Sequence, residues 1–145
     1  AIKLHTSIGA ALLQRLDAKE MSAVALHHHR FYNGTKGYPR RCPPCPPEYK
    51  AIVDLVAVSD SIEAATDNVG RCYSSAKSFS TIISELRAES GTRYSPDVVA
   101  LFDDEEFCRA LEQELTSERR RAYVTIYGNS AQRPTQFTRI SIHEN

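Results

Sequence analysis

Apolar positions recur at helical spacing along most of the chain. Over residues 2–16, every third or fourth residue is apolar, and the same spacing returns over residues 19–30. A longer apolar stretch without a helix-breaking residue covers 48–67. We therefore expect helices over these three ranges.

The second half of the chain carries clear helix start and stop signals. Ser78 precedes an apolar-faced stretch over 79–89, and Gly91 follows it where a left-handed C-terminal cap favours glycine. Ser95 is followed by proline and aspartate, which is typical of a helix N-terminus. A final helix is expected over 105–127, with acidic residues early and arginines late.

The pattern predicts an all-α fold built as a helical bundle. The segment 33–47 is expected to be a loop, because Asn-Gly, Gly-Tyr-Pro and Pro-Pro-Cys-Pro-Pro follow one another there. A strand-like alternation occurs only over 137–142, close to the C-terminus. A length of 145 residues fits a single globular unit.

Composition and charge narrow the choice of partners and location. The chain has 18 Lys and Arg against 18 Asp and Glu, so general attraction to DNA, RNA or anionic membranes is not expected, and an anionic ligand needs a local site. No stretch approaches the roughly 20 apolar residues of a membrane span. The first residues lack a signal-peptide cleavage pattern, so we expect a cytoplasmic location.

The cysteines do not form the dense pattern of a small disulfide-rich fold. They are Cys42, Cys45, Cys72 and Cys108. Free thiols are therefore expected, with disulfides as the alternative. Cys42 and Cys45 form a single CxxC without a second ligand pair, so we interpret them as loop residues rather than as a structural zinc site.

Asp60 is the first residue whose position calls for a chemical explanation. With Ile52 and Val56 it follows an i, i+4, i+8 spacing, which places it on the stripe expected to face the core. A buried, unpaired carboxylate is costly, so proteins pair it, neutralise it or give it a metal ion. Each of these three solutions is open at Asp60.

Histidines near the first two predicted helices offer partners for that carboxylate. His28 and His29 point about 100° apart, so they can bind one ion from two sides or each bind one of two close ions. His5 is in line with Ile8 and Leu12 and is expected to face inward. Imidazole with carboxylate suits Fe, Mn or Zn. Hydrogen-bonded core histidines are the alternative interpretation.

A series of short motifs follows the histidines in a distinctive order. In sequence they are His5, His28-His29, Asn33-Gly34, Gly37-Tyr38-Pro39, Asp60, Arg71-Cys72-Tyr73 and Gly91-Thr92-Arg93-Tyr94-Ser95-Pro96. Over residues 2–102 this order resembles the second half of an HD-GYP domain, a bacterial phosphodiesterase module of the HD superfamily. The resemblance implies an HD-type helical bundle.

The resemblance also implies a metal-dependent reaction. The implied metal ligands are His5, His28, His29 and Asp60, and the implied substrate contacts are Gly37, Tyr38, Pro39 and Arg71. The cofactors would be divalent metal ions, two of them, with Fe or Mn first and Zn or Mg as alternatives. Water activated by these ions would hydrolyse a phosphodiester, typically a cyclic dinucleotide such as cyclic di-GMP, without a catalytic side-chain nucleophile.

The chain departs from the family pattern around the substrate loop. Arg30 stands where the family has a glutamate after the two histidines, Asn33 stands where it has an aspartate, and one residue is inserted before Gly37. These departures favour retained metal binding with altered or lost substrate preference. Two alternatives stay open: a catalytically degenerate regulatory or interaction module, and a plain helical bundle whose histidines lie apart.

The family's first half, with the His-Asp doublet, does not precede His5. We therefore expect a bundle that is incomplete at its N-terminal side and is completed by a longer protein or a second chain. An upstream sensor or receiver domain is a further expected partner. The expected division places the C-terminal half of the HD-GYP-like domain at 1–102 and a helical extension and tail at 103–145.

Overall fold

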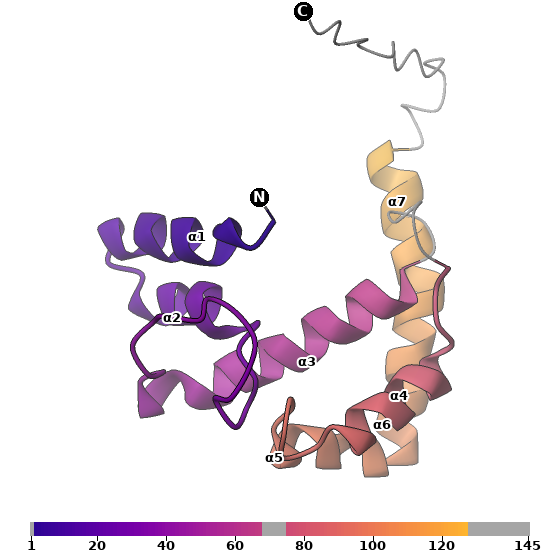
Figure 1. Cartoon of the computed structure of the whole chain (residues 1–145). Helices are drawn as coiled ribbons and strands as arrows, with labels where there is room; N and C mark the ends of the chain where they lie inside the picture. Colours follow the sequence, from indigo (N-terminus) through magenta and orange to yellow (C-terminus); the bar gives the residue numbers. More distant parts are fainter. Residues whose placement is uncertain (1, 68–74, 128–145) are drawn as a thin grey trace, which may run out of the picture.

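The computed structural model describes residues 2–67 and 75–127, and the described chain is all-α (Figure 1). The helices are α1 (Leu4–Arg15), α2 (Lys19–His27), η1 (Pro47–Tyr49), α3 (Lys50–Thr66), α4 (Phe79–Ala88), α5 (Pro96–Val99), η2 (Ala100–Asp103), α6 (Glu105–Gln113), η3 (Glu114–Glu118) and α7 (Arg119–Tyr127). Across these described ranges there are two isolated β-bridges and no strand. None of the described helices is long and apolar enough to cross a membrane.

The predicted helices are present, with small shifts at their ends. The helix expected over 19–30 ends at His27, because the chain turns there and Arg30 pairs with Gly37 in an isolated bridge. The helix expected over 105–127 is continuous through α6, η3 and α7, and η3 is a π-helical turn. The possible strand at 137–142 lies outside the described residues.

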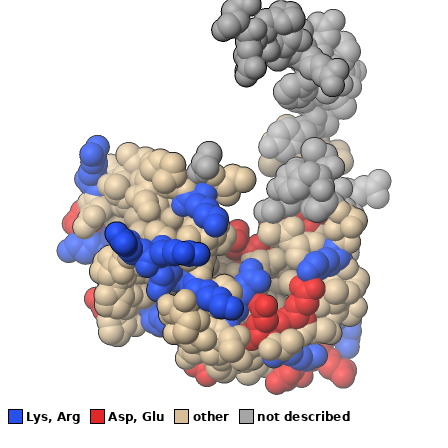
Figure 2. Space-filling view, viewed as in Figure 1, with Lys and Arg blue, Asp and Glu red and all other residues tan. Residues whose placement is uncertain are grey.

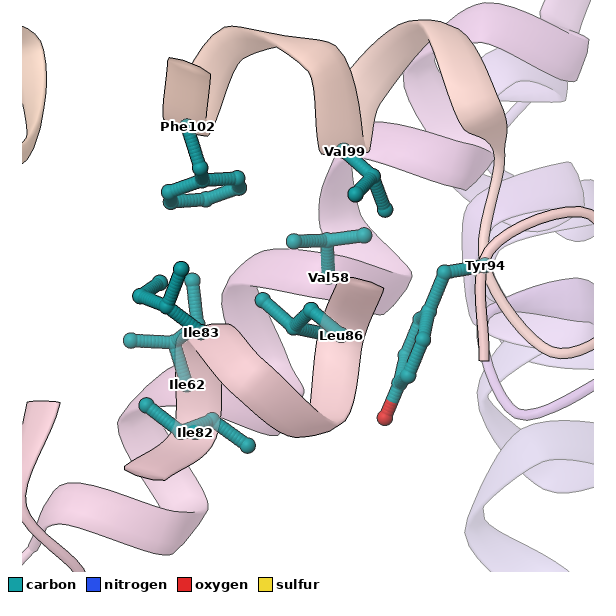
Figure 3. Close-up of a cluster of buried hydrophobic side chains, with 8 residues drawn as sticks. All are labelled: Val58, Ile62, Ile82, Ile83, Leu86, Tyr94, Val99 and Phe102. Atoms are coloured by element: carbon teal, nitrogen blue, oxygen red, sulfur yellow. The ribbon is translucent and has the colours of Figure 1, made fainter. Parts of the chain in front are cut away.

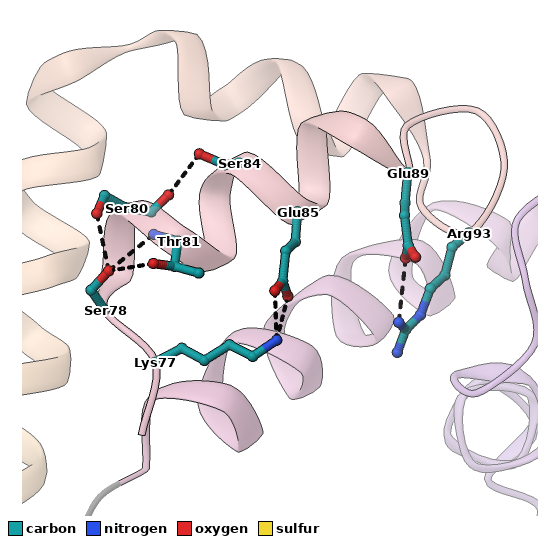
Figure 4. Close-up of polar contacts among 8 residues, drawn as sticks. All are labelled: Lys77, Ser78, Ser80, Thr81, Ser84, Glu85, Glu89 and Arg93. Carbon is teal, nitrogen blue, oxygen red and sulfur yellow. Dashed lines mark hydrogen bonds and ion pairs between the residues drawn. The ribbon is translucent and has the colours of Figure 1, made fainter. Parts of the chain in front are cut away.

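Side-chain caps fix the starts of two helices. The Ser78 hydroxyl accepts a hydrogen bond from the backbone N–H of Thr81 at the start of α4 (Figure 4). The Asp104 carboxylate accepts two backbone N–H groups at the start of α6. Ser95 does occupy the N-cap position of α5, but its side chain makes no capping hydrogen bond. That start rests on the proline that follows, whose fixed φ suits a first helical turn.

A hydrophobic core packs α3, α4, α5 and η2 together (Figure 3). It consists of Val58, Ile62, Ile82, Ile83, Leu86, Tyr94, Val99 and Phe102. Leu86 is completely buried at its centre. Side chains of α6 and η3, among them Leu111 and Leu115, pack against the same cluster. Residues beyond 102 thus contribute to this core, while the division of the chain at 102 and 103 stays a prediction.

α1 packs against α2 through small residues, which overturns one expectation. Thr6 and Ala10 are buried on α1, whereas His5, Ile8 and Leu12 are exposed. The close approach of the two helices explains this, because small side chains line their contact and the Ser22 hydroxyl donates to the Ala10 carbonyl at 3.0 Å. The prediction that His5 faces inward with Ile8 and Leu12 is therefore wrong.

α3 buries a different stripe from the one expected. Its buried residues are Val53, Asp54, Val58 and Ile62. Asp60 is only half-buried, so its expected place on the core-facing stripe is wrong as well. The buried carboxylate of this helix is Asp54, which pairs with Lys50 one turn earlier.

Candidate metal centre

A cleft of about 920 Å³ lies where α1, α2 and α3 meet the loops after α2 and α4. All four predicted metal ligands line it: His5, His28, His29 and Asp60. Gly37 and Tyr38 come to it from the loop after α2, and Arg93 and Tyr94 come from the loop after α4. Residues far apart in the sequence therefore share one cavity.

His5 and His28 face each other with their Nε2 atoms 3.3 Å apart. In His5, Nδ1 donates to the Ile2 carbonyl at 2.6 Å, and in His28, Nδ1 donates to the Val24 carbonyl at 2.9 Å. A carbonyl only accepts, so both rings carry their proton on Nδ1 when neutral. Each Nε2 is then a lone pair, and both lone pairs point into the same space.

This spacing fits two ligands of one cation. With metal–nitrogen bonds of about 2.0–2.1 Å, adjacent ligand atoms lie about 2.9 Å apart at right angles and about 3.4 Å apart in a tetrahedron. The observed 3.3 Å falls within this range. Backbone carbonyls that hold the outer ring nitrogen are also the usual way in which metal-binding histidines are oriented.

His29 completes the cluster and reaches toward Asp60. One ligand atom each from His5, His28 and His29 lies within 4.8 Å of the others, and no further group of this kind occurs in the residues that the structure describes. Nδ1 of His29 lies 3.8 Å from Oδ2 of Asp60. Burial, and after it the neighbouring His28, lower the pKa of His29 to about 4, so its ring is neutral near pH 7 and free to bind a cation.

The donor set of three imidazoles and one carboxylate fits a divalent transition metal. Such ions prefer imidazole nitrogen with carboxylate oxygen, and a neutral His29 meets the requirement that ligands be unprotonated. The structure thus clusters the three histidines and places Asp60 in the same cleft against one of them, so the predicted ligands do not lie apart as in a plain bundle. Their role as metal ligands stays a prediction.

Arg30 closes the loop that carries the Gly-Tyr-Pro motif. Its guanidinium donates to the carbonyls of Gly34 at 2.9 Å, Pro39 at 3.0 Å and Arg40 at 3.3 Å. These contacts join both ends of the loop from Gly34 to Arg40, so Arg30, which departs from the family pattern, stabilises the conformation of this loop. The Asn33 side chain likewise accepts from Thr35 and stabilises a local turn.

Gly37 has a steric role in the same loop. Its φ is +92°, and a Cβ at this position would lie 2.2 Å from the His29 carbonyl oxygen. Only glycine allows this approach, which lets the backbone N–H of Tyr38 donate to that carbonyl at 3.2 Å. The motif therefore ties the loop directly to one of the clustered histidines.

Tyr38 covers one side of the histidine cluster. Its ring centroid lies 4.6 Å from that of His29 and 6.2 Å from that of His5. Burial and the nearby Asp60 raise the pKa of Tyr38, so its hydroxyl stays protonated. Pro39 does not line the cleft, and its carbonyl instead accepts from Arg30. Arg71 lies outside the described residues.

Besides Arg30, two basic residues that the sequence did not single out as substrate contacts line the cleft. Lys77 pairs with Glu85 at 2.6 Å, and Arg93 pairs with Glu89 at 3.3 Å (Figure 4). Arg93 falls inside a quoted motif, but its side chain is not part of the family pattern there. Lys77 precedes α4 in a stretch without any motif, so no local signal identifies it.

The surface around this region is unevenly charged despite the neutral total. In Figure 2, Lys and Arg side chains gather over α1, α2 and the loop that follows, whereas Asp and Glu gather nearer to α4 and α6. An anionic ligand would thus meet local positive charge on the visible face.

Comparison with known proteins relates the chain to a phosphodiesterase. Over 123 residues, which are 83% of this chain, it is 32% identical to a cyclic di-GMP phosphodiesterase of Thermotoga maritima. The chain spans 30% of the length of that relative. No protein-family model matches the chain, and no solved structure gives a significant match. At this coarse level the similarity supports the resemblance to a phosphodiesterase module.

Proposed function

We propose that this chain is part of a metal-dependent phosphodiesterase of the HD-GYP type that hydrolyses cyclic di-GMP or a closely related phosphodiester. The observation that carries the proposal is the 3.3 Å approach of the His5 and His28 Nε2 lone pairs, with His29 and Asp60 beside them. Two lone pairs at this distance repel each other unless a proton or a cation lies between them. The similarity to a cyclic di-GMP phosphodiesterase supports the substrate class.

The residues that line the cleft would have different roles in the reaction. Divalent ions held by the three histidines and Asp60 would lower the pKa of water and offset charge on the phosphate. The Tyr38 hydroxyl, which stays protonated, can donate a hydrogen bond to a substrate oxygen. Lys77 and Arg93 can bind phosphate oxygens if they exchange their present glutamate partners for the substrate. The resemblance adds Arg71 to these phosphate contacts.

A second ion would need donors beyond these four residues. Three imidazoles and one carboxylate can fill most positions around one ion, but Fe and Mn commonly take about six ligands. We propose that a longer polypeptide or a second chain supplies the remaining donors. Activity is therefore proposed for the full protein rather than for residues 1–145 alone.

Metal content and hydrolysis, measured together on the full-length protein, test this proposal. His28→Ala should reduce bound Mn or Fe and lower cyclic di-GMP hydrolysis by about 100-fold or more, because it removes one of the two facing lone pairs. His143→Ala, at a histidine outside the predicted ligand set, is the matched control and should leave both unchanged. Normal hydrolysis by the His28→Ala protein would refute the proposal.

The second candidate is a regulatory module that binds metal without turnover. Arg30 favours it, because an arginine replaces the family's glutamate and its side chain is occupied by three loop carbonyls. The same experiment separates the two candidates. Metal that depends on His28, together with no hydrolysis by the wild-type protein, would identify the regulatory module.

A further inference from the structure

A groove of about 670 Å³ lies between the end of α3, the start of α4 and the long helix formed by α6, η3 and α7 (Figure 1). Its walls include Thr66, Phe79, Leu115, Arg119 and Val124, and we call it the Arg119 groove. Its volume is within the range of small-molecule sites, which is about 300–1,000 Å³. Among the residues that the structure describes, Lys77 alone lines both this groove and the cleft of the candidate metal centre.

The Arg119 side chain is 10% exposed and makes few polar contacts. Its Nη2 donates to the Thr66 hydroxyl at 3.1 Å and to the Glu63 carbonyl at 3.5 Å, both in the last turn of α3. The Glu63 carboxylate lies 4.0 Å from the same nitrogen and is half-exposed. Within the described part of the chain, a nearly buried positive charge therefore has no carboxylate closer than 4.0 Å.

The remaining donors of this guanidinium are open to a ligand. A guanidinium carries five N–H donors, and the contacts above use one nitrogen, so Nε and Nη1 of Arg119 have no partner among the described residues. No fully buried side-chain nitrogen or oxygen of the described chain lacks a partner, so these two atoms border open space rather than packed protein. A guanidinium pairs well with the two oxygens of a carboxylate side by side, and the attraction is stronger where water is largely excluded.

The rest of the groove suits an apolar group and tolerates negative charge near Arg119. Phe79 and Leu115, which also pack against the core, form an apolar wall with Val124, which is 63% exposed. Covering this wall with an apolar group would remove apolar surface from water. Glu112 also lines the groove, but it is exposed and precedes Arg119 by seven residues, which is about 10 Å along a helix. At that distance water and salt screen its repulsion of an anion.

We propose that the Arg119 groove binds a small organic anion, with a carboxylate at the Arg119 guanidinium and an apolar body along the apolar wall. Lys77 adds positive charge at the groove, while Glu85 holds its ammonium at 2.6 Å on the side of the metal-centre cleft. The site does not depend on the proposed hydrolase function, since it contains none of the predicted metal ligands. Its occupation is measured without hydrolysis, so the two proposals can fail separately.

Isothermal titration calorimetry of the full-length protein tests the groove with three probes, which are octanoate, 1-octanol and acetate. A chelator without carboxylate groups removes metal ions, so that a carboxylate probe has no metal to bind. Octanoate should bind at one equivalent and at least about tenfold more tightly than 1-octanol, which has the same chain length without the charge. Octanoate should also bind at least about tenfold more tightly than acetate, which lacks the apolar body.

Three substitutions test whether the preference for octanoate over 1-octanol comes from the guanidinium. Arg119→Met keeps an unbranched side chain without the charge, so it should bind the two probes about equally. Arg119→Lys should restore part of the preference, which distinguishes loss of the charge from loss of the fold. Arg109→Met, at an exposed arginine of α6 outside the groove, is the matched control and should bind both probes as the wild-type protein does. The proposal is wrong if the wild-type protein shows no preference, if Arg119→Met keeps it, if Arg109→Met loses it, or if Arg119→Lys does not restore it.

Discussion

His29 should make the stability of the metal-free protein depend on pH in a defined window. Its side chain is 25% exposed, and burial with neighbouring charges lowers its pKa from 6.5 to about 4. The folded state thus favours the neutral ring, whereas the unfolded chain takes up a proton below pH 6.5. The stabilisation is complete above that pH and is lost as the pH falls toward about 4.

The size of the effect follows from the same values. A pKa that falls from 6.5 to about 4 corresponds to at most about 3 kcal/mol of unfolding free energy. Between about pH 7.5 and about pH 4.5 the expected loss from His29 is about 2 to 3 kcal/mol. Asp60 works in the opposite direction and is already included, because its negative charge raises this pKa.

Urea unfolding in the presence of a chelator measures this contribution. The wild-type protein and His29→Asn are compared across the window, because asparagine keeps a polar group but does not titrate there. The wild-type protein should lose about 2 to 3 kcal/mol more than the variant on acidification. If both proteins lose the same stability between these pH values, His29 is not held neutral by its surroundings and the reasoning fails.

Two pairs of matched substitutions test the loop and the core. Gly37→Ala should lower metal affinity at least about tenfold, because the added Cβ would lie 2.2 Å from the His29 carbonyl oxygen. Gly34→Ala is the control, because an added Cβ there would have no atom within 4 Å. It should cost only about 1 kcal/mol of backbone strain and leave metal binding intact. Equal effects of the two on metal titration would contradict this. Leu86→Ala, at a fully buried side chain, should cost about 3 to 5 kcal/mol in urea unfolding, whereas Leu12→Ala, at 55% exposure, should stay within about 0.5 kcal/mol. A small effect at Leu86 would show that the core closes around the cavity.

Helix positions were predictable because their signals are local. Spacing of apolar residues, the Ser78 cap and the glycine at position 91 act within one or two turns of the chain. The side of each helix that faces the core was harder to predict. α3 is apolar on more than one side, and its buried stripe is selected by the packing of α4 against it, through residues such as Ile82 and Leu86. The spacing of apolar residues in one sequence does not determine which side of α3 packs against α4, and this is why the predicted orientation of Asp60 is wrong.

The order of the motifs predicts that the histidines of the candidate site lie close together, but it does not predict the hydrogen bonds that orient their rings. The order of motifs indicated which histidines would meet. Nothing in the sequence indicates that Nδ1 of His5 and Nδ1 of His28 donate to carbonyls three and four residues earlier, which leaves the two Nε2 lone pairs facing each other. From the sequence, Arg30 is only a departure from the family pattern, because its contacts with the Gly34 and Pro39 carbonyls depend on the path of the folded loop.

The four residues from His27 to Arg30 show how one helix end can serve several sites. His27 is the last residue of α2 and the chain turns directly after it, so the side chains that follow leave the helix end in different directions. His27 lines a separate cleft together with Cys42 and Cys45, His28 and His29 line the cleft of the candidate metal centre, and the Arg30 side chain contacts the loop carbonyls. Gly37 then fixes the loop against the His29 carbonyl, so the loop cannot shift without moving the end of the helix. The two clefts also share Arg30 and Phe31 in their linings, so both depend on the loop that positions Tyr38 beside the histidine cluster.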